Sequence, residues 1–290
     1  EGLDTITLSK LNLSAETEPV LTRWNEFLRR HKNPKAEVTI GLIGKYVELQ
    51  DSYKSILEAF IHAGAENEVK VRVEPIHSEF ISQDIITNKI SKLDGLLVAP
   101  GFGERGIEGK IKAVQYAREH EIPFLGICLG MQMAVIEFAR NVAGLKDANS
   151  TEMQADTSAP VISLMEDQKD LKNMGGTMRL GSWACDLKPG SIVAGVYDSE
   201  TISERHRHRY EFNDKYRAEL EKAGLKITGT NPKTGLVEIV EMEGHPWFVG
   251  VQYHPEYKST VANPHPLFVA YVQAAVKYSQ SKSSANVAHD

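Results

Sequence analysis

From residue 37 onward, short apolar runs alternate with amphipathic stretches along the chain. Strand-like runs cover Val38–Gly44, Val69–Ile76 and Asp94–Pro100, and helical spacing covers Ser52–His62 and about Glu108–Glu119. Because strands that alternate with helices need crossover connections, this pattern predicts a parallel sheet with helices on its faces. The expected fold class is α/β, with an open, largely parallel central sheet.

The second half of the chain has a less regular pattern. Strand-like runs cover part of Gly175–Leu187, then Arg207–Phe212, and then LKITGT, LVEIVEM and WFVGVQYH, with a helix over Asp214–Ala223. Short polar turns separate the last runs, so we expect antiparallel strands added to the sheet. A final helix is predicted over about Pro266–Tyr278, and residues 282–290 are expected to form a disordered tail.

The first 36 residues differ from the rest. Leu21, Trp24, Phe27 and Leu28 lie on one side of a predicted helix, which a basic run and Asn33-Pro34 follow. We interpret 1–36 as a lead-in and 37–281 as one domain.

The segment Gly126–Asn141 begins as a strand and turns into a helix at Cys128. Gly126 and Gly130 flank this elbow, and glycine allows both a sharp turn and the approach of a substrate. A thiol at a helix N-terminus is favoured as the thiolate, which suits a nucleophile. The alternative is a buried core cysteine, the usual place of a free thiol.

Composition limits the possible functions. The chain has 290 residues, 41% apolar and 25% charged, with a formal net charge of −6, which argues against general binding to nucleic acid or anionic membranes. No apolar run has the length of a spanning helix, and the start lacks the plan of a signal peptide. With only two cysteines, disulfides are not expected to hold the chain together and a cysteine-based metal site is excluded. Reduced thiols in a cytoplasmic protein without a metal are expected.

A second chemical motif is His254-Pro255-Glu256. Proline keeps the preceding residue out of the α region, and in an extended segment residues two apart share a face. His254 and Glu256 are therefore predicted to project together, as a base for the Cys128 thiol and a carboxylate that orients it. The alternative is a loop histidine beside a surface glutamate.

A third motif is APGFGERG at the end of the third predicted strand. Acyl transfer needs amides directed at the oxyanion, and Gly101 in this turn can supply one while Leu129 supplies another. The alternative is a plain turn. GLIGKY and GIEGKI lack the spacing and the Ser or Thr of a phosphate-binding loop, so we reject an ATP site built on them.

Together the three motifs resemble the class I glutamine amidotransferases, whose pattern G-x-C-x-G-x-Q followed by H-P-E is present as GICLGMQ and HPE. Further stretches resemble the glutaminase half of the CTP synthase family, namely GKYVELQDSYKSILEAFIHAG, GGTMRLG, ERHRHRYEFN and VQYHPEYKS. One departure is Phe102, where many relatives have a second glycine. The resemblance makes residues 1–36 a connector from a synthetase half that lies outside this chain.

The resemblance implies that Cys128 attacks the side-chain amide of L-glutamine, that His254 moves protons and that Glu256 holds His254. It implies glutamine contacts from residues that share one pocket in the family, namely Gly101, Leu129, Gln132, Glu152 and Arg209. A carboxylate and a guanidinium suit a zwitterionic amino acid, although without the resemblance Glu152 and Arg209 would be ordinary surface charges.

For the whole enzyme, the resemblance implies that ammonia aminates UTP to CTP, with ATP, Mg and UTP bound only in the synthetase half. It further implies no cofactor in this domain, activation by GTP and a homo-oligomeric enzyme. Arg179 in GGTMRLG is a candidate for the GTP response, the alternative being a surface arginine.

Two other functions remain open on these grounds. A cysteine hydrolase or peptidase of related fold is one, although the residue order of α/β-hydrolases and the papain signature are both absent. A catalytically silent interaction module is the other, because an intact triad in an unformed site has the same sequence.

Overall fold

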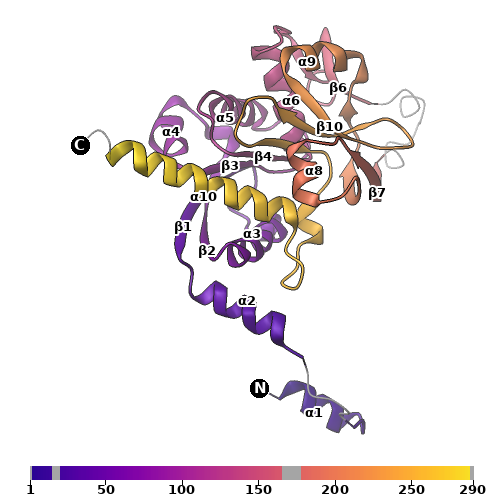
Figure 1. Ribbon diagram of the computed structural model, residues 1–290. Helices are drawn as coiled ribbons and strands as arrows, with labels where there is room; N and C mark the ends of the chain where they lie inside the picture. The colour runs from indigo at the N-terminus through magenta and orange to yellow at the C-terminus, as the bar shows by residue number, and fades with distance from the viewer. Residues whose placement is uncertain (1, 15–19, 165–177, 288–290) are drawn as a thin grey trace.

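A nine-stranded sheet forms the centre of the computed structural model, which describes residues 2–14, 20–164 and 178–287 (Figure 1). Its strand order is β2-β1-β3-β4-β12-β11-β10-β7-β8, and a three-stranded sheet has the order β5-β6-β9. The strands are β1 (Ala36–Gly44), β2 (Val69–His77), β3 (Gly95–Val98), β4 (Phe124–Ile127), β5 (Ala148–Ser150), β6 (Ala159–Ser163), β7 (Arg179–Leu187), β8 (Thr201–His208), β9 (Glu211–Phe212), β10 (Leu225–Thr230), β11 (Val237–Met242) and β12 (Phe248–Val251).

Helices connect most of these strands. The α-helices are α1 (Leu3–Lys10), α2 (Thr22–Lys32), α3 (Lys54–Glu66), α4 (Gln83–Asn88), α5 (Ile107–Glu119), α6 (Leu129–Asn141), α8 (Ile192–Tyr197), α9 (Arg217–Ala223) and α10 (Pro266–Val287). The short 3-10 helices are η1 (Gln50–Tyr53), η2 (Ser78–Phe80), η3 (Ile90–Lys92), η5 (Asp214–Tyr216) and η6 (Pro255–Lys258).

The large sheet has a parallel part and an antiparallel part. Strands β2, β1, β3, β4 and β12 pair in parallel, while β12, β11, β10, β7 and β8 pair in antiparallel fashion. The predicted α/β fold with added antiparallel strands is therefore confirmed. The carboxyl ends of β3, β4 and β12, which are neighbours in the sheet, lie at one edge, where open α/β sheets bind ligands.

The sequence pattern failed at β8, because the predicted run Arg207–Phe212 covers only the last two residues of this strand and then β9. Along this strand exposed and buried positions alternate, and the buried positions from Ile202 onward are Glu204, His206 and His208. A strand whose inward residues are charged or polar has no hydrophobic alternation for a pattern search to find. The short helix α4 was also missed.

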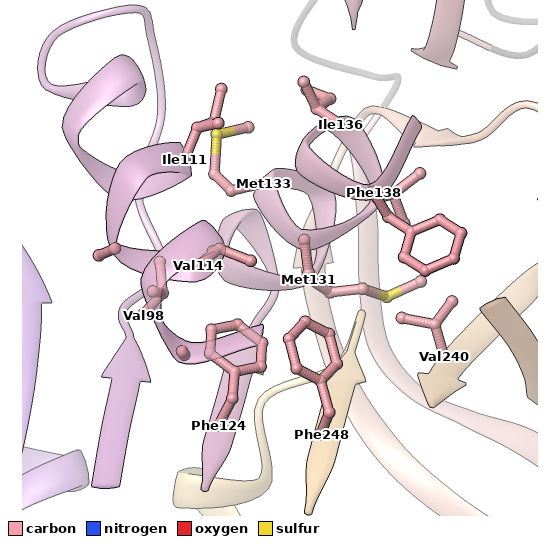
Figure 2. Packing of buried hydrophobic residues seen from close by; sticks show 14 of the residues in the cluster. Val98, Ile111, Val114, Phe124, Met131, Met133, Ile136, Phe138, Val240 and Phe248 are labelled. Atoms are coloured by element: carbon pink, nitrogen blue, oxygen red, sulfur yellow. The ribbon is translucent and has the colours of Figure 1, made fainter. Parts of the chain in front are cut away.

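Two apolar cores fill the two faces of the sheet. Helices α5 and α6 cover one face, and α3 and α10 cover the other, with α10 running across the front of the view (Figure 1). On the α6 face, Phe124 of β4 stacks on Phe248 of β12 with ring centroids 4.4 Å apart, and Met131 of α6 extends toward Val240 (Figure 2). These contacts fix β4 and α6, the elements on either side of Cys128, against β12.

One helix of the N-terminal region lies against the domain. Helix α2 packs on α3, as the ion pair between Arg30 and Glu66 at 2.9 Å shows, and none of its residues is buried. The predicted boundary at residue 37 lies next to the start of β1, while the division into domains stays a prediction.

The end of α10 differs from the expected tail. The helix does not end near Tyr278 but continues to Val287, and 288–290 lie outside the described residues. No Gly or Pro interrupts this stretch, and Lys282 Nζ bonds the carbonyl oxygens of Lys92 and Leu93. None of the helices in the described ranges is long and apolar enough to cross a membrane.

Two glycines allow α6 to lie close to the strands. A Cβ at Gly126 would lie 2.7 Å from the Gly130 carbonyl, and a Cβ at Gly130 would lie 2.1 Å from the Val98 carbonyl oxygen. Neither glycine has a positive φ. The flanking glycines predicted from the sequence are therefore required by close packing, and our argument from a sharp backbone turn at these two positions was wrong.

We predict that Gly130→Ala lowers the free energy of unfolding by about 1–3 kcal/mol, the usual cost of overpacking. The matched control is Gly195→Ala in α8, where a Cβ meets nothing within 4 Å, so that helix propensity raises stability by up to about 1 kcal/mol. Denaturant unfolding of both variants measures the difference. Equal stability of the two variants would show that α6 does not need this close approach.

Candidate active site

Cys128 lies at a strained turn between β4 and α6. Its φ of 53° and ψ of −105° place a residue with a Cβ in a region that such residues rarely adopt. The Cys128 amide donates to the Val251 carbonyl oxygen at 2.7 Å, which ties the turn to the end of β12. A backbone outlier held by its surroundings is a common property of functional sites. The predicted elbow is present.

His254 and Glu256 follow β12 and form a pair. His254 Nδ1 lies 2.7 Å from Glu256 Oε1, and both side chains are buried. His254 has the non-helical backbone expected before proline, with φ −113° and ψ 86°. The predicted extended geometry was wrong after that point, because Pro255 opens the 3-10 helix η6. The two side chains meet across this turn and not along a strand.

The environment of His254 favours its charged form. Burial lowers the pKa of His254, but the neighbouring sulfur of Cys128 and the Glu256 carboxylate raise it, to about 11. Because Glu256 engages Nδ1, the other ring nitrogen is left for exchange of a proton at the sulfur. A histidine held as imidazolium beside a cysteine is the arrangement that activates thiol nucleophiles.

The second cysteine has a different environment. Cys185 lies in β7 with no exposed surface, and burial, together with the charge of Glu238, raises its thiol pKa. A buried thiol of this kind is inert. Of the two thiols, only Cys128 has the neighbours that a nucleophile needs.

The predicted oxyanion residues lie beside the elbow. Gly101 follows β3, and a Cβ placed on it would be 3.5 Å from Leu129 Cδ2. Leu129 is the first residue of α6, and the amides of a first helical turn have no acceptor within the helix. The structure therefore brings Gly101, Leu129 and Cys128 together at the carboxyl ends of β3 and β4.

The small sheet brings the two predicted glutamine-binding charges near each other. Glu152 follows β5, Arg209 precedes β9, and β6 pairs with both strands. Burial raises the pKa of the Tyr210 hydroxyl, and the charge of Glu152 raises it further, whereas the charge of Arg209 lowers it. Both charges therefore lie close enough to act on the same side chain. Glu152 Oε1 also accepts a hydrogen bond from the Gly103 amide at 2.8 Å, which joins Glu152 to the loop that contains Gly101.

Gln132 lies on α6, one turn after Cys128, and is buried. Its Nε2 donates to the Tyr210 carbonyl at 3.0 Å and to Gln252 Oε1 at 3.1 Å. Because its amide group already has protein partners, Gln132 holds the Arg209–Tyr210 segment in place. Sequence reasoning missed Tyr210 and Gln252, although both stand in stretches that it singled out, ERHRHRYEFN and VQYHPEYKS.

Arg179 lies in a buried charge cluster, so the surface alternative was wrong. Its Nη2 bonds Glu238 Oε1 at 2.5 Å, and its Nη1 lies 3.6 Å from Glu211 Oε1. Burial raises the pKa of Glu211 to about 8 and that of Glu238 to about 7, and Arg179 opposes both shifts. The allosteric role of Arg179 stays a prediction.

The buried histidines of β8 link this cluster to the segment that contains Arg209 and Tyr210. His206 Nδ1 lies 2.9 Å from His208 Nε2, and His208 Nδ1 lies 3.2 Å from the Tyr210 carbonyl oxygen. Burial lowers the pKa of His206 to about 2 and of His208 to about 3, with Arg179 acting in the same direction. Both rings are therefore neutral and contribute hydrogen bonds without charge.

Comparison with known proteins places this geometry in a family. The glutamine amidotransferase class-I family pattern matches residues 48–274. The CTP synthase of Christiangramia forsetii is 70% identical over 99% of this chain and 53% of its own length. The CTP synthase of Flavobacterium johnsoniae is 66% identical over 95% of this chain and 51% of its own length. The chain thus spans about half the length of these curated relatives.

A solved structure gives the same assignment. The glutaminase domain of Trypanosoma brucei CTPS with bound acivicin is 38% identical, with a TM-score of 0.78, covering 83% of this chain and 94% of that one. A GMP synthase component from Thermoplasma acidophilum, 14% identical with a TM-score of 0.53 over 85% of this chain and 98% of that one, shares the fold. This chain belongs to the class I glutamine amidotransferase family and corresponds to the glutaminase half of CTP synthases.

Proposed function

We propose that the chain hydrolyses the side-chain amide of L-glutamine to glutamate and ammonia, with Cys128 as nucleophile, His254 as proton carrier and Glu256 as its partner. The observation that carries the proposal is the strained turn at the buried Cys128, whose sulfur interacts with His254 of the His254–Glu256 pair. The family and the acivicin complex of the T. brucei relative support the same chemistry.

In the first half-reaction, the Cys128 sulfur attacks the amide carbon and the carbonyl electrons move onto oxygen. The amides of Gly101 and Leu129 stabilise that oxyanion. As the oxyanion collapses, the carbon–nitrogen bond breaks, and the imidazolium of His254 gives its proton to the leaving nitrogen. Ammonia departs and a glutamyl thioester remains on Cys128.

In the second half-reaction, water attacks the thioester carbon. Neutral His254 takes a proton from the water, and a second oxyanion forms at the same amides. Its collapse expels the Cys128 thiolate and releases glutamate, so one water is consumed for each glutamine. Glu256 stabilises the imidazolium at both stages.

The amino-acid end of glutamine fits the charges beside the small sheet. Glu152 suits the ammonium group and Arg209 suits the carboxylate, and Gln132 keeps the Arg209 segment in place through the Tyr210 carbonyl. These assignments rest on charge complementarity and on the placement of the four residues around α6.

The names of the relatives suggest the use of the ammonia. We propose that it aminates UTP in a synthetase domain of the same polypeptide, which would bind ATP and Mg, and that the full enzyme is a GTP-activated homo-oligomer of the cytoplasm. Because Glu238 engages the Arg179 guanidinium, Arg179 would influence GTP activation through the buried cluster and not as an exposed ligand.

The first prediction concerns the nucleophile. Cys128→Ala lowers glutamate formation by on the order of 10⁴-fold or more, because it removes the atom that forms the thioester. Acivicin adds one adduct to the wild-type chain and none to this variant, as read by mass spectrometry. Cys185→Ala is the control, and it keeps both activity and labelling. An adduct on Cys185 would contradict the assignment.

The second prediction concerns pH. Glu256→Gln removes one of the two groups that raise the His254 pKa, so the imidazolium loses its proton at a lower pH than in the wild type. The alkaline fall of kcat/KM then begins at a lower pH, and the rate at neutral pH drops roughly 100-fold. Unchanged alkaline limbs in the two profiles would show that Glu256 does not support the charged histidine.

The third prediction concerns the nucleotide reaction. With glutamine, UTP, ATP, Mg and GTP present, this chain forms glutamate and no CTP, because its Gly-Lys pairs lack the Ser or Thr of a phosphate-binding loop. The full-length C. forsetii CTP synthase, assayed in parallel, is the positive control. Formation of CTP by the chain alone would show that an acceptor site lies within it.

A further inference from the structure

Lys110 of α5 is a charged residue that the proposed mechanism does not use. Among the described residues it is the only lysine with no exposed surface, and its neighbours on the helix, Ile107, Ile111 and Val114, belong to the apolar core. Burying a lysine costs free energy unless its donors are engaged, so such a residue needs a structural or chemical reason.

The contact of Lys110 lies at the start of the oxyanion loop, residues 99–103. Lys110 Nζ donates to the Ala99 carbonyl oxygen at 2.8 Å, and a Cβ on Gly101 would lie 3.8 Å from the same Nζ. At the other end of the loop, Lys45 Nζ bonds the Phe102 carbonyl, and the Gly103 amide bonds Glu152. Two buried lysines thus hold two carbonyls of one short loop.

These contacts restrict the direction of the Gly101 amide. Pro100 has a fixed φ and no N–H, so once the Ala99 carbonyl is held, the ψ of Pro100 decides where the next amide points. Holding the Phe102 carbonyl fixes the far end of the same turn. The peptide group that carries the Gly101 N–H therefore lies between two anchored carbonyls, beside Leu129 and Cys128.

We propose that Lys110 is a positioning residue that directs the Gly101 amide toward the oxyanion formed at Cys128. The proposal rests on the glutaminase function proposed above and deepens it. An amide aligned in advance stabilises the oxyanion without rearrangement during the reaction, so the effect belongs to the chemical step and not to glutamine binding.

The bond to Ala99 does not depend on the charge of Lys110. Burial and repulsion from Lys45 lower the pKa of Lys110 to about 7, and the sulfur of Cys128 opposes that shift. An amine has N–H groups in both protonation states. The Ala99 carbonyl is therefore held at any pH where the enzyme is folded.

The test compares Lys110→Met with Lys112→Met, a control at an exposed position of the same helix. Glutamate formation gives kcat and KM for glutamine, and iodoacetamide gives the alkylation rate of Cys128, which needs no oxyanion amide. Both are measured well above pH 7, where Lys110 is neutral and its charge does not act on the Cys128 sulfur. We expect kcat of Lys110→Met to fall at least about tenfold, toward the roughly 100-fold cost of losing an oxyanion donor. KM and the alkylation rate should each stay within about twofold of the control.

Three outcomes would overturn the proposal. They are a kcat within about twofold of the control, a loss confined to KM, and equal losses of kcat and of alkylation, the last of which indicates a general collapse of the site. If Lys110→Met does not fold, Lys110→Gln replaces it, because the glutamine amide is polar but too short to reach the Ala99 carbonyl. The same fall in kcat and the same three contrary outcomes then apply. If the wild type and Lys112→Met form no glutamate, the glutaminase function itself fails.

Discussion

The backbone turn at Cys128 is the constraint on which the site depends. A residue held at φ 53° and ψ −105° costs of order 1–3 kcal/mol, so the surrounding contacts must maintain it. Two contacts maintain it, namely the hydrogen bond from the Cys128 amide to the Val251 carbonyl oxygen and the close packing of Gly130 on the Val98 carbonyl. Because β3, β4 and β12 are adjacent, the segments after them bring Gly101, Cys128 and His254 into one place.

Several buried charged side chains of the site have polar partners that offset part of the loss of water. Lys110 and Lys45 bond backbone carbonyls of the oxyanion loop, and Arg179 bonds Glu238. Desolvation offsets most of the attraction in a buried ion pair, so the pair adds little net stability, but breaking it costs about 3–5 kcal/mol. Such contacts therefore make the site rigid more than they make the fold stable. The comparison of the two thiols shows the effect of such surroundings, since burial and the charge of Glu238 raise the pKa of the Cys185 thiol although Arg179 opposes them.

The sequence predicted the parts of the molecule whose local pattern reflects their environment. The buried parallel strands, the elbow at Cys128 and the family followed from apolar runs and motifs. Other features depend on packing between distant segments, and no local pattern reports them. His206 and His208 fill inward positions of β8, which are apolar in most half-buried strands. The buried Lys110 lies in a Gly-Lys pair that we considered only as a phosphate-binding loop and rejected.

Above all, we propose that glutamine acylates Cys128, with the carbonyl oxygen of the glutamyl group between the amides of Gly101 and Leu129. The most direct measurement is a crystal structure of the chain after reaction with a diazoketone analogue of glutamine, whose ketone oxygen occupies the oxyanion position. We expect a bond to Cys128 Sγ, the oxygen about 2.7–3.1 Å from both amide nitrogens, and the amino-acid end between Glu152 and Arg209. A bond to another residue, or an oxygen directed away from both amides, would contradict the account.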